Sequence, residues 1–186
     1  MSIMLILIPG RNIRIVSNST NPMLSEHITI ISGYMMSNLY DQSKESPRRR
    51  KNLNLHESYK ENCQRLLNAI HVNSYIRPHR HKRNKKKELL VALKGHFSLI
   101  TFDNVGNFNT SYCFGTESFH PNVGIEVPPN AWHTVVARVK NSVLLEVKEG
   151  PFSPNIAKEF ASWAPEEGTK AAASFLRKCH KFAAAK

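Results

Sequence analysis

The chain has 186 residues, the usual size of one domain and enough to bury a hydrophobic core. Its 26 lysines and arginines against 14 acidic residues give a net charge of +12, which makes nucleic acid a partner to test. Apolar residues make up 41% of the chain, which excludes wholesale disorder. The longest clean apolar run, Ile3 to Ile8, is far shorter than the ~20 residues of a membrane span.

The N-terminus also lacks the pattern of a secretory signal, because no basic residue precedes the apolar run and Pro9-Gly10-Arg11 follows it. Three cysteines, Cys63, Cys113 and Cys179, are widely separated and odd in number. This spacing indicates neither a disulfide framework nor a cysteine-type zinc site. We therefore expect a soluble cytoplasmic protein with no membrane association.

The first part of the chain divides into two segments. Residues 1–22 combine an apolar patch with turn-forming residues, and we interpret them as a disordered extension or a mis-assigned start before Met23. Residues 23–62 form an N-terminal segment, in which 28–31 is predicted as a short strand. Apolar residues then recur at helical spacing until Ser46-Pro47, which predicts a helix ending there.

Residues 63–152 are rich in strand-forming residues. The predicted strand regions are 63–81, 88–103, 107–114, 123–137 and 142–149, separated by turn signals. Residues 88–103 have the pattern of one hairpin with its turn at Lys94-Gly95. Strands at such regular spacing favour an antiparallel sandwich or a small barrel, because closing the sheet removes its edges.

The C-terminal segment, 153–186, is predicted to be helical. Ser153-Pro154 has the pattern of a helix start, and Ile156, Phe160 and Trp163 would share one apolar face. A second helix is predicted after Thr169. Its apolar residues on one side are Ala172, Phe175, Leu176 and Cys179.

Histidines carry the most informative pattern. On a strand, His79 and His81 present two imidazoles to the same face, and Glu88 can add a carboxylate from the next strand. His133 follows the tight turn at 128–130 and can bring a third imidazole from across a barrel. Three imidazoles and one carboxylate would leave a coordination position open, as catalytic metal sites require. The plainer interpretation of the His-x-His pair alone is chance placement on an exposed strand.

Taken together, these residues resemble the two motifs of the cupins. The first motif corresponds to Asn73, His79, His81, Glu88 and Gly95, and the second to Asn122, Pro128, Asn130, His133 and Ala137. Asparagine replaces three of the family's glycines, and it is the residue after glycine that best tolerates a left-handed backbone. The gap between His81 and Glu88 is longer than in the family, and its added residues fall in the loop 82–87.

Longer phrases resemble one group of cupins, the WbuC family, over roughly residues 24–180. These phrases are Ser46–Ser58, Gln64–Ala69, Ile125–Thr134, Leu145–Pro151 and Trp163–Gly168. The resemblance implies a mainly β fold, the cupin double-stranded β-helix or jelly-roll barrel, with an N-terminal helix and C-terminal helices packed outside. It also implies one divalent metal, zinc, iron, manganese or nickel, held by His79, His81, Glu88 and His133. It further implies a homodimer and a link to O-antigen and lipopolysaccharide gene clusters, without a settled reaction.

Other residues are candidates for ligand binding or proton transfer. Asn52, Asn54 and His56 share one strand face, which would either line the open end of the barrel or face solvent. Arg77 has the parity of His79, which favours an anion clamp, whereas Arg80 should point outward. Trp132 is a substrate platform or, more commonly, core. Glu88 and Glu126 are the candidate catalytic carboxylates, although Glu126 can equally cap a turn.

Three functions are open at this point. The leading one is a metal-binding cupin acting on a small anionic or sugar metabolite of cell-surface polysaccharide synthesis, as an isomerase or dioxygenase for example. The alternative is a non-catalytic module that binds a sugar or effector. Nucleic-acid binding is the weakest, because no aromatic residue is interleaved with the basic runs 48–51 and 82–87. We interpret the positive charge as a field around a small anion.

Overall fold

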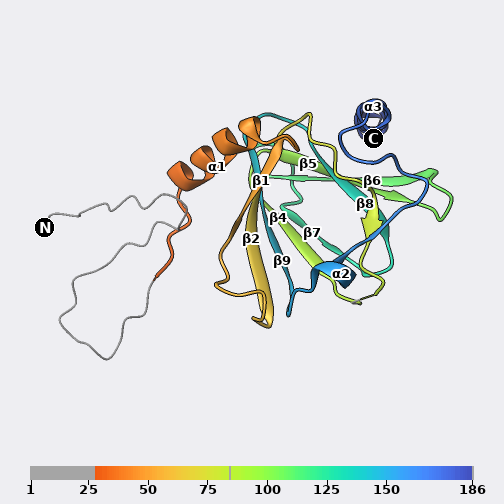
Figure 1. Cartoon of the computed structure of the whole chain (residues 1–186). Coiled ribbons are helices and arrows are strands. Elements are labelled where there is room, and N and C mark those ends of the chain that lie inside the picture. The colour runs from red at the N-terminus through yellow and green to blue at the C-terminus, as the bar shows by residue number, and fades with distance from the viewer. Residues whose placement is uncertain (1–27, 84, 186) are drawn as a thin grey trace, which may run out of the picture.

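The computed structural model describes residues 28–83 and 85–185, and the N-terminal extension predicted for 1–22 lies outside this range. The fold is a cupin jelly roll, in which two five-stranded antiparallel sheets face each other (Figure 1). One sheet has the order β1-β2-β9-β4-β7 and the other β10-β3-β8-β5-β6. The strands are β1 Arg50–Asn54, β2 Cys63–Ile70, β3 His79–Arg80, β4 Glu88–Lys94, β5 His96–Phe102, β6 Phe108–Gly115, β7 Gly124–Val127, β8 Trp132–Ala137, β9 Ser142–Glu149 and β10 Glu159–Phe160.

Alternating apolar residues on the inner faces of both sheets make the barrel core. Leu90 and Leu144 come from the first sheet, and Phe97, Leu99 and Val135 come from the second. Phe97 is fully buried and stacks on Phe114 with ring centroids 5.3 Å apart. Contacts among the inner-face residues of both sheets, rather than this stack within one sheet, hold the sheets face to face.

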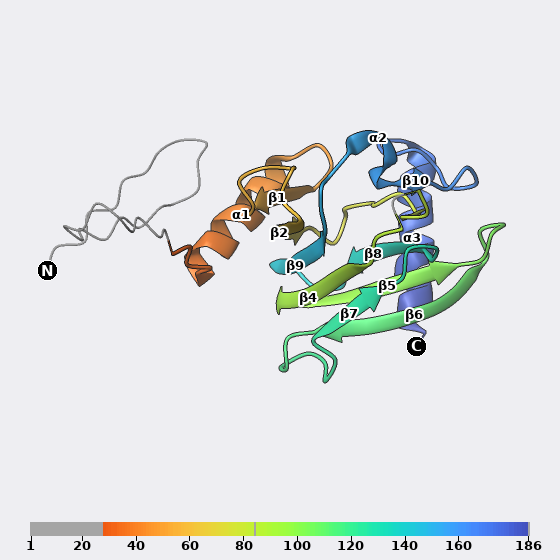
Figure 2. The same ribbon diagram turned by 90° about the horizontal axis from the view of Figure 1, so that it is seen from below.

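Helices cover the outside of the barrel. The helix α1, Gly33–Glu45, begins at Ser32, whose hydroxyl accepts a hydrogen bond from the Met35 N–H, and it ends before Pro47 as predicted. It packs on β1, β2 and β9, while α3, Lys170–Ala184, packs on β5 and β6 of the other sheet (Figures 1 and 2). Thr169 caps α3 as predicted. No helix within the described residues is long and apolar enough to cross a membrane.

Three local predictions are wrong. Residues 28–32 form no strand, and Ile28 and Ile30 are exposed. The pattern at Ser153-Pro154 starts only α2, Pro154–Ala157, because the chain then turns extended and Glu159–Phe160 pairs with β3. Long-range pairing therefore overrides a local helix signal, and Phe160 is left half exposed.

The hairpin predicted over 88–103 is the third. β4 pairs with β7 and β9, whereas β5 pairs with β6 and β8, so the chain crosses from one sheet to the other at Gly95. A Lys-Gly pair marks a sharp turn, but it does not specify whether the two strands pair with each other. Gly95 has φ +82° there, and a Cβ would clash with the Ser142 hydroxyl oxygen.

We therefore expect Gly95→Ala to lower the free energy of unfolding by about 1–3 kcal/mol, since it adds both backbone strain and a clash. Gly33→Ala at the start of α1 is the matched control, because a Cβ there would meet nothing within 4 Å. Its effect should stay within about 0.5 kcal/mol. Urea unfolding of both variants measures the difference, and equal stabilities would contradict the account of this corner.

Candidate metal centre

Three buried histidines meet on the inner face of the second sheet. His79 lies on β3 and pairs directly with His133 on β8, and His81 follows β3 with its N–H donated to the Pro129 carbonyl. Ring centroids are 4.5 Å apart for His79 and His133, 5.2 Å for His79 and His81, and 5.6 Å for His81 and His133. Strand parity and register thus bring together three imidazoles from two segments of the chain.

Backbone carbonyls fix the orientation of all three rings. The Nδ1 of His79 lies 3.0 Å from the Arg77 carbonyl oxygen, and that of His133 lies 2.9 Å from the Ala131 oxygen. The Nδ1 of His81 lies 2.6 Å from the oxygen of Ala157 in α2. A carbonyl only accepts, so each Nδ1 must donate its hydrogen, and a neutral ring then carries its lone pair on Nε2.

The three Nε2 atoms are buried and have no hydrogen-bond partner. An unpaired buried nitrogen is costly, and three of them pointing at one place call for a shared partner. Burial, followed by the Lys158 charge, also lowers the pKa of His79 well below its ordinary value, which keeps this ring neutral as metal ligation requires.

Glu88 completes the cluster from the opposite sheet. It begins β4, is 4% exposed, and places Oε2 at 3.5 Å from the His81 Nε2 and 3.4 Å from the His133 Nε2. One ligand atom from each of the four residues lies within 4.8 Å of the others. The long loop after His81 therefore does not displace Glu88.

This donor set fits a divalent metal ion. Three imidazole nitrogens and one carboxylate oxygen suit zinc, iron, manganese or nickel, and the carbonyl contacts at Nδ1 are the outer contacts that metal-bound histidines usually have. The cluster can therefore hold an ion. His79, His81, Glu88 and His133 are the four residues that the cupin motifs predicted.

Two charged residues beside the cluster were not predicted. Lys148 on β9 pairs with Glu88 on β4, and its Nζ lies 3.1 Å from Glu88 Oε1 and 2.5 Å from Glu146 Oε1. Burial opposes the charged form of Glu88, but Lys148 and the two imidazoles hold its pKa well below its ordinary value. Burial, and then the charge of Glu88, raises the pKa of Glu146. Glu146 and Lys148, at alternate positions directly after the apolar run 143–145, were the available signal.

The cluster opens into a cavity of about 370 Å³, within the usual range for small-molecule sites. His79, Glu88 and His133 line it beside apolar residues such as Leu90 and Val135. The polar and charged residues that line the rest are Arg48, Arg50, Asn52, Tyr59, Asn68, Glu146, Lys148, Lys158 and Glu167.

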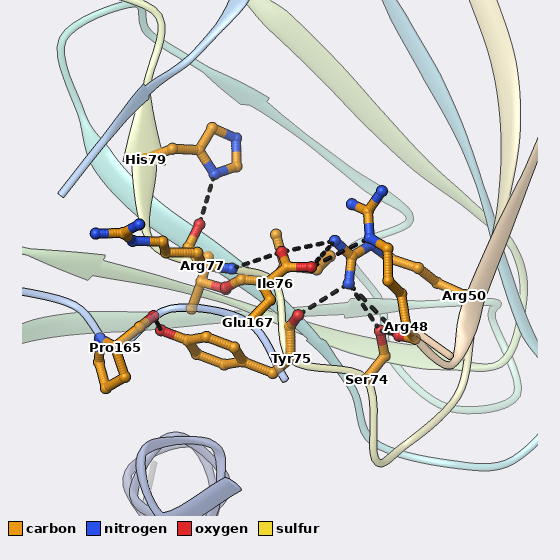
Figure 3. A network of polar contacts seen from close by, with 10 residues as sticks. Arg48, Arg50, Ser74, Tyr75, Ile76, Arg77, His79, Pro165 and Glu167 are labelled. Carbon is orange, nitrogen blue, oxygen red and sulfur yellow. Dashed lines mark hydrogen bonds and ion pairs between the residues drawn. The ribbon is translucent and has the colours of Figure 1, made fainter. Parts of the chain in front are cut away.

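An ion-pair network borders this cavity. The Arg50 Nη2 lies 2.7 and 2.8 Å from the two carboxylate oxygens of Glu167, and Arg48 Nε lies 3.1 Å from the same group (Figure 3). Arg50 also donates to the Tyr75 carbonyl, and the Arg77 N–H reaches Glu167 at 3.4 Å. The C-terminal segment is thereby tied to β1 and to the chain entering β3.

Glu167 should contribute to stability in a pH-dependent way. Burial opposes its charged form, but Arg50 and Arg48 outweigh burial and lower its pKa below the ordinary 4.5. A lowered folded-state pKa means that the stabilisation is present above pH 4.5 and is lost as the pH falls through the folded-state value. We expect Glu167→Gln to lose about 1–2 kcal/mol at pH 7, and less as the pH falls below 4.5.

The matched control is Glu166→Gln, because its carboxylate is 80% exposed and lies 3.7 Å from Arg77. That variant should stay within about 0.5 kcal/mol of the parent protein at every pH. Urea unfolding between pH 3 and pH 7 measures both, and a loss for Glu167→Gln that does not depend on pH would contradict the assignment.

The predicted substrate-binding residues on β1 are only partly at the cavity. Asn52 lines it. Asn54 is outside the lining, with its side chain bonded to Asn52 at 3.0 Å. His56 lies beyond the end of β1, where the alternation stops, and its Nδ1 accepts the Arg65 N–H at 3.1 Å. His56 is 5% exposed and does not line the cavity.

Arg77 and Trp132 also lie outside the cavity lining. Pro78 separates Arg77 from β3, so strand parity does not extend to it, and its guanidinium donates to the Ala161 carbonyl at 3.0 Å. Trp132 occupies the outer face of β8, opposite to His133, and packs in the core beneath α3. Arg80 points outward as predicted and stacks on Trp132 at 4.2 Å.

Glu126 does not reach the cluster. β7 turns Val127 inward to the core and leaves Glu126 exposed on the other face. Its carboxylate pairs with Lys87 at 2.8 Å, and both side chains are more than half exposed. Glu126 therefore lies outside the cavity lining, and the carboxylates that line the cavity are Glu88, Glu146 and Glu167.

A family model described as a domain of unknown function, DUF6016, matches residues 31–114. This range includes His79, His81 and Glu88 but ends before His133. No curated protein matches the sequence.

Among solved structures, the chain is similar to protein SO0799 from Shewanella oneidensis, with a TM-score of 0.50 and 9% identity over 77% of this chain and 94% of that one. KdgF from Halomonas sp. gives a TM-score of 0.45 and 13% identity, with coverage of 59% and 84%. Oxalate decarboxylase from Bacillus subtilis gives 0.45 and 18%, and the match spans 60% of this chain but only 27% of that enzyme. Such distant likenesses concern the fold alone.

Proposed function

We propose that this protein is a cupin metalloprotein that binds one divalent ion through His79, His81, Glu88 and His133 and acts on a small anionic or sugar metabolite. The observation that carries the proposal is the convergence of three buried, unpartnered Nε2 atoms on Glu88 at the end of a cavity. When bound, zinc, iron, manganese or nickel would polarise a ligand oxygen or activate a bound water or dioxygen.

The chain's own residues supply binding and proton transfer around that position. Apolar side chains such as Leu90 and Val135 exclude water from one wall of the cavity, while Asn52 and Tyr59 offer hydrogen bonds. Glu146 is the candidate proton carrier, since burial and the charge of Glu88 raise its pKa and the Lys148 ammonium contacts its carboxylate. An isomerase or a dioxygenase reaction is compatible with this set of groups.

We further propose that the protein belongs with the WbuC cupins and serves O-antigen or lipopolysaccharide biosynthesis, as a cytoplasmic homodimer. Residues from the sequence segments that resemble the WbuC cupins line the cavity, which supports a ligand shared with that family. Arg48, Arg50 and Asn52 come from the first phrase, and Glu167 from the last; all four line the cavity. Lys148 comes from a third phrase.

The test combines metal content with a biological readout. Elemental analysis of the purified protein should find about one divalent ion per chain, and His79→Ala and His133→Ala should lose it. Each variant should also fail to restore the O-antigen pattern of a strain that lacks the gene. A parent protein free of metal would overturn the proposal. Full restoration by metal-free variants would instead establish the non-catalytic binding module.

A further inference from the structure

Among the described residues that line the cavity, Lys158 is the cation without a hydrogen bond or an ion pair. Lys148 is held by Glu88 and Glu146, and Arg50 is held by Glu167 and the Tyr75 carbonyl. Within the described part of the chain, the Lys158 ammonium has neither a hydrogen bond nor an ion pair, although its side chain is partly buried and lines the cavity. A charge withdrawn from water requires a counter-charge.

The backbone on both sides of Lys158 is fixed to the histidine cluster. The carbonyl of Ala157 contacts the His81 Nδ1 at 2.6 Å, and Phe160 pairs with His79 between β10 and β3. Lys158 itself ends α2 with extended dihedral angles, φ −140° and ψ 136°. The backbone of Lys158 is therefore held beside the histidine cluster, and its side chain reaches the cavity lining from there.

The charges of the cavity also favour an anion. Glu88 and Glu146 together balance Lys148 and Lys158, and the three histidines are neutral when they ligate. Arg48 and Arg50 exceed Glu167 by one positive charge, and a divalent ion would add its own charge to this excess. Among the described residues, the remaining carboxylate that lines the cavity, Glu167, already pairs with these two arginines.

We propose that Lys158 binds the anionic group of the ligand, a small carboxylate or phosphate that also reaches the metal. This inference rests on the proposed function, because it takes the metal position as the second anchor. Lys158 would then select anionic over neutral ligands and hold them in register with the ion, as charge-assisted hydrogen bonds do elsewhere.

The experiment uses protein loaded with Co²⁺, whose visible spectrum reports ligand binding, at fixed ionic strength. Malonate and inorganic phosphate are the two anionic probes, and their affinities show whether the subsite prefers a carboxylate or a phosphate. Imidazole is the neutral metal ligand. Lys158→Met should weaken the better of the two anions by about 10- to 100-fold. Affinities for Co²⁺ and for imidazole should not change, and Lys158→Arg should retain most of the anion affinity.

Lys82→Met is the matched control, because it removes the same charge from an exposed loop position. An equal loss of anion affinity in Lys82→Met and Lys158→Met would overturn the inference, as would a parent protein that binds neither anion. Calorimetric titration of Co²⁺ into metal-free protein measures the metal affinity by itself. It therefore separates the proposed metal site from the anion subsite inferred here. Failure to bind Co²⁺ overturns the metal site, whereas anion binding that does not depend on Lys158 overturns this subsite.

Discussion

Replacing Lys148 by methionine should lower the free energy of unfolding of the metal-free protein by about 3–5 kcal/mol, because Glu88 and Glu146 would remain buried without their shared cation. The side chain of Lys148 is only 9% exposed, so its ammonium neutralises the two carboxylates away from bulk water. Denaturant unfolding in the presence of a chelator measures this loss. Among the expected changes in stability, this is the largest.

Two further measurements identify the cause. Lys140→Met removes the same charge at an exposed position and should change stability by no more than about 0.5 kcal/mol. Addition of Zn²⁺ should recover part of the loss in Lys148→Met, since an ion bound to Glu88 restores positive charge beside the carboxylates. Equal stabilities of the two lysine variants would show that the buried network does not stabilise the pairing of β4 with β9.

His133→Ala should weaken Zn²⁺ binding by at least about 100-fold, because it removes one of three nitrogen donors from a preformed site. His120→Ala is the matched control, since His120 lies in the loop before β7 and contacts His96 rather than the cluster. Competition with a chromophoric chelator measures both affinities. Equal affinities of the two variants would mean that zinc binds elsewhere on the chain.

The cluster itself was predictable because strand parity is a local property. His79 and His81 share a face by spacing alone, and the motif containing His133 supplied the third ring. Predicting Glu88 as a metal ligand also required that the loop before it can lengthen without moving β4. The positions of these residues depend on short-range geometry, which can be inferred directly from the spacing in the sequence.

The rest of the cavity depends on long-range pairing. Lys158 lies in a segment whose local pattern predicts a helix, and only the pairing of β10 with β3 brings it beside His79. Strand parity predicts Arg77 on the same face as His79, but Pro78 interrupts the alternation of side chains before β3. The turn signal at Gly95 predicts a hairpin, but such a signal does not identify the partner strand, and β4 and β5 pair in different sheets.

In the proposed site, one ion binds to three imidazoles and a carboxylate inside the barrel. X-ray absorption spectroscopy of the protein loaded with one equivalent of Zn²⁺ tests this claim directly. We expect a shell of nitrogen and oxygen at about 2.0–2.1 Å with the scattering pattern of imidazole rings. A sulfur shell at about 2.3 Å, or the spectrum of the hydrated ion, would contradict it.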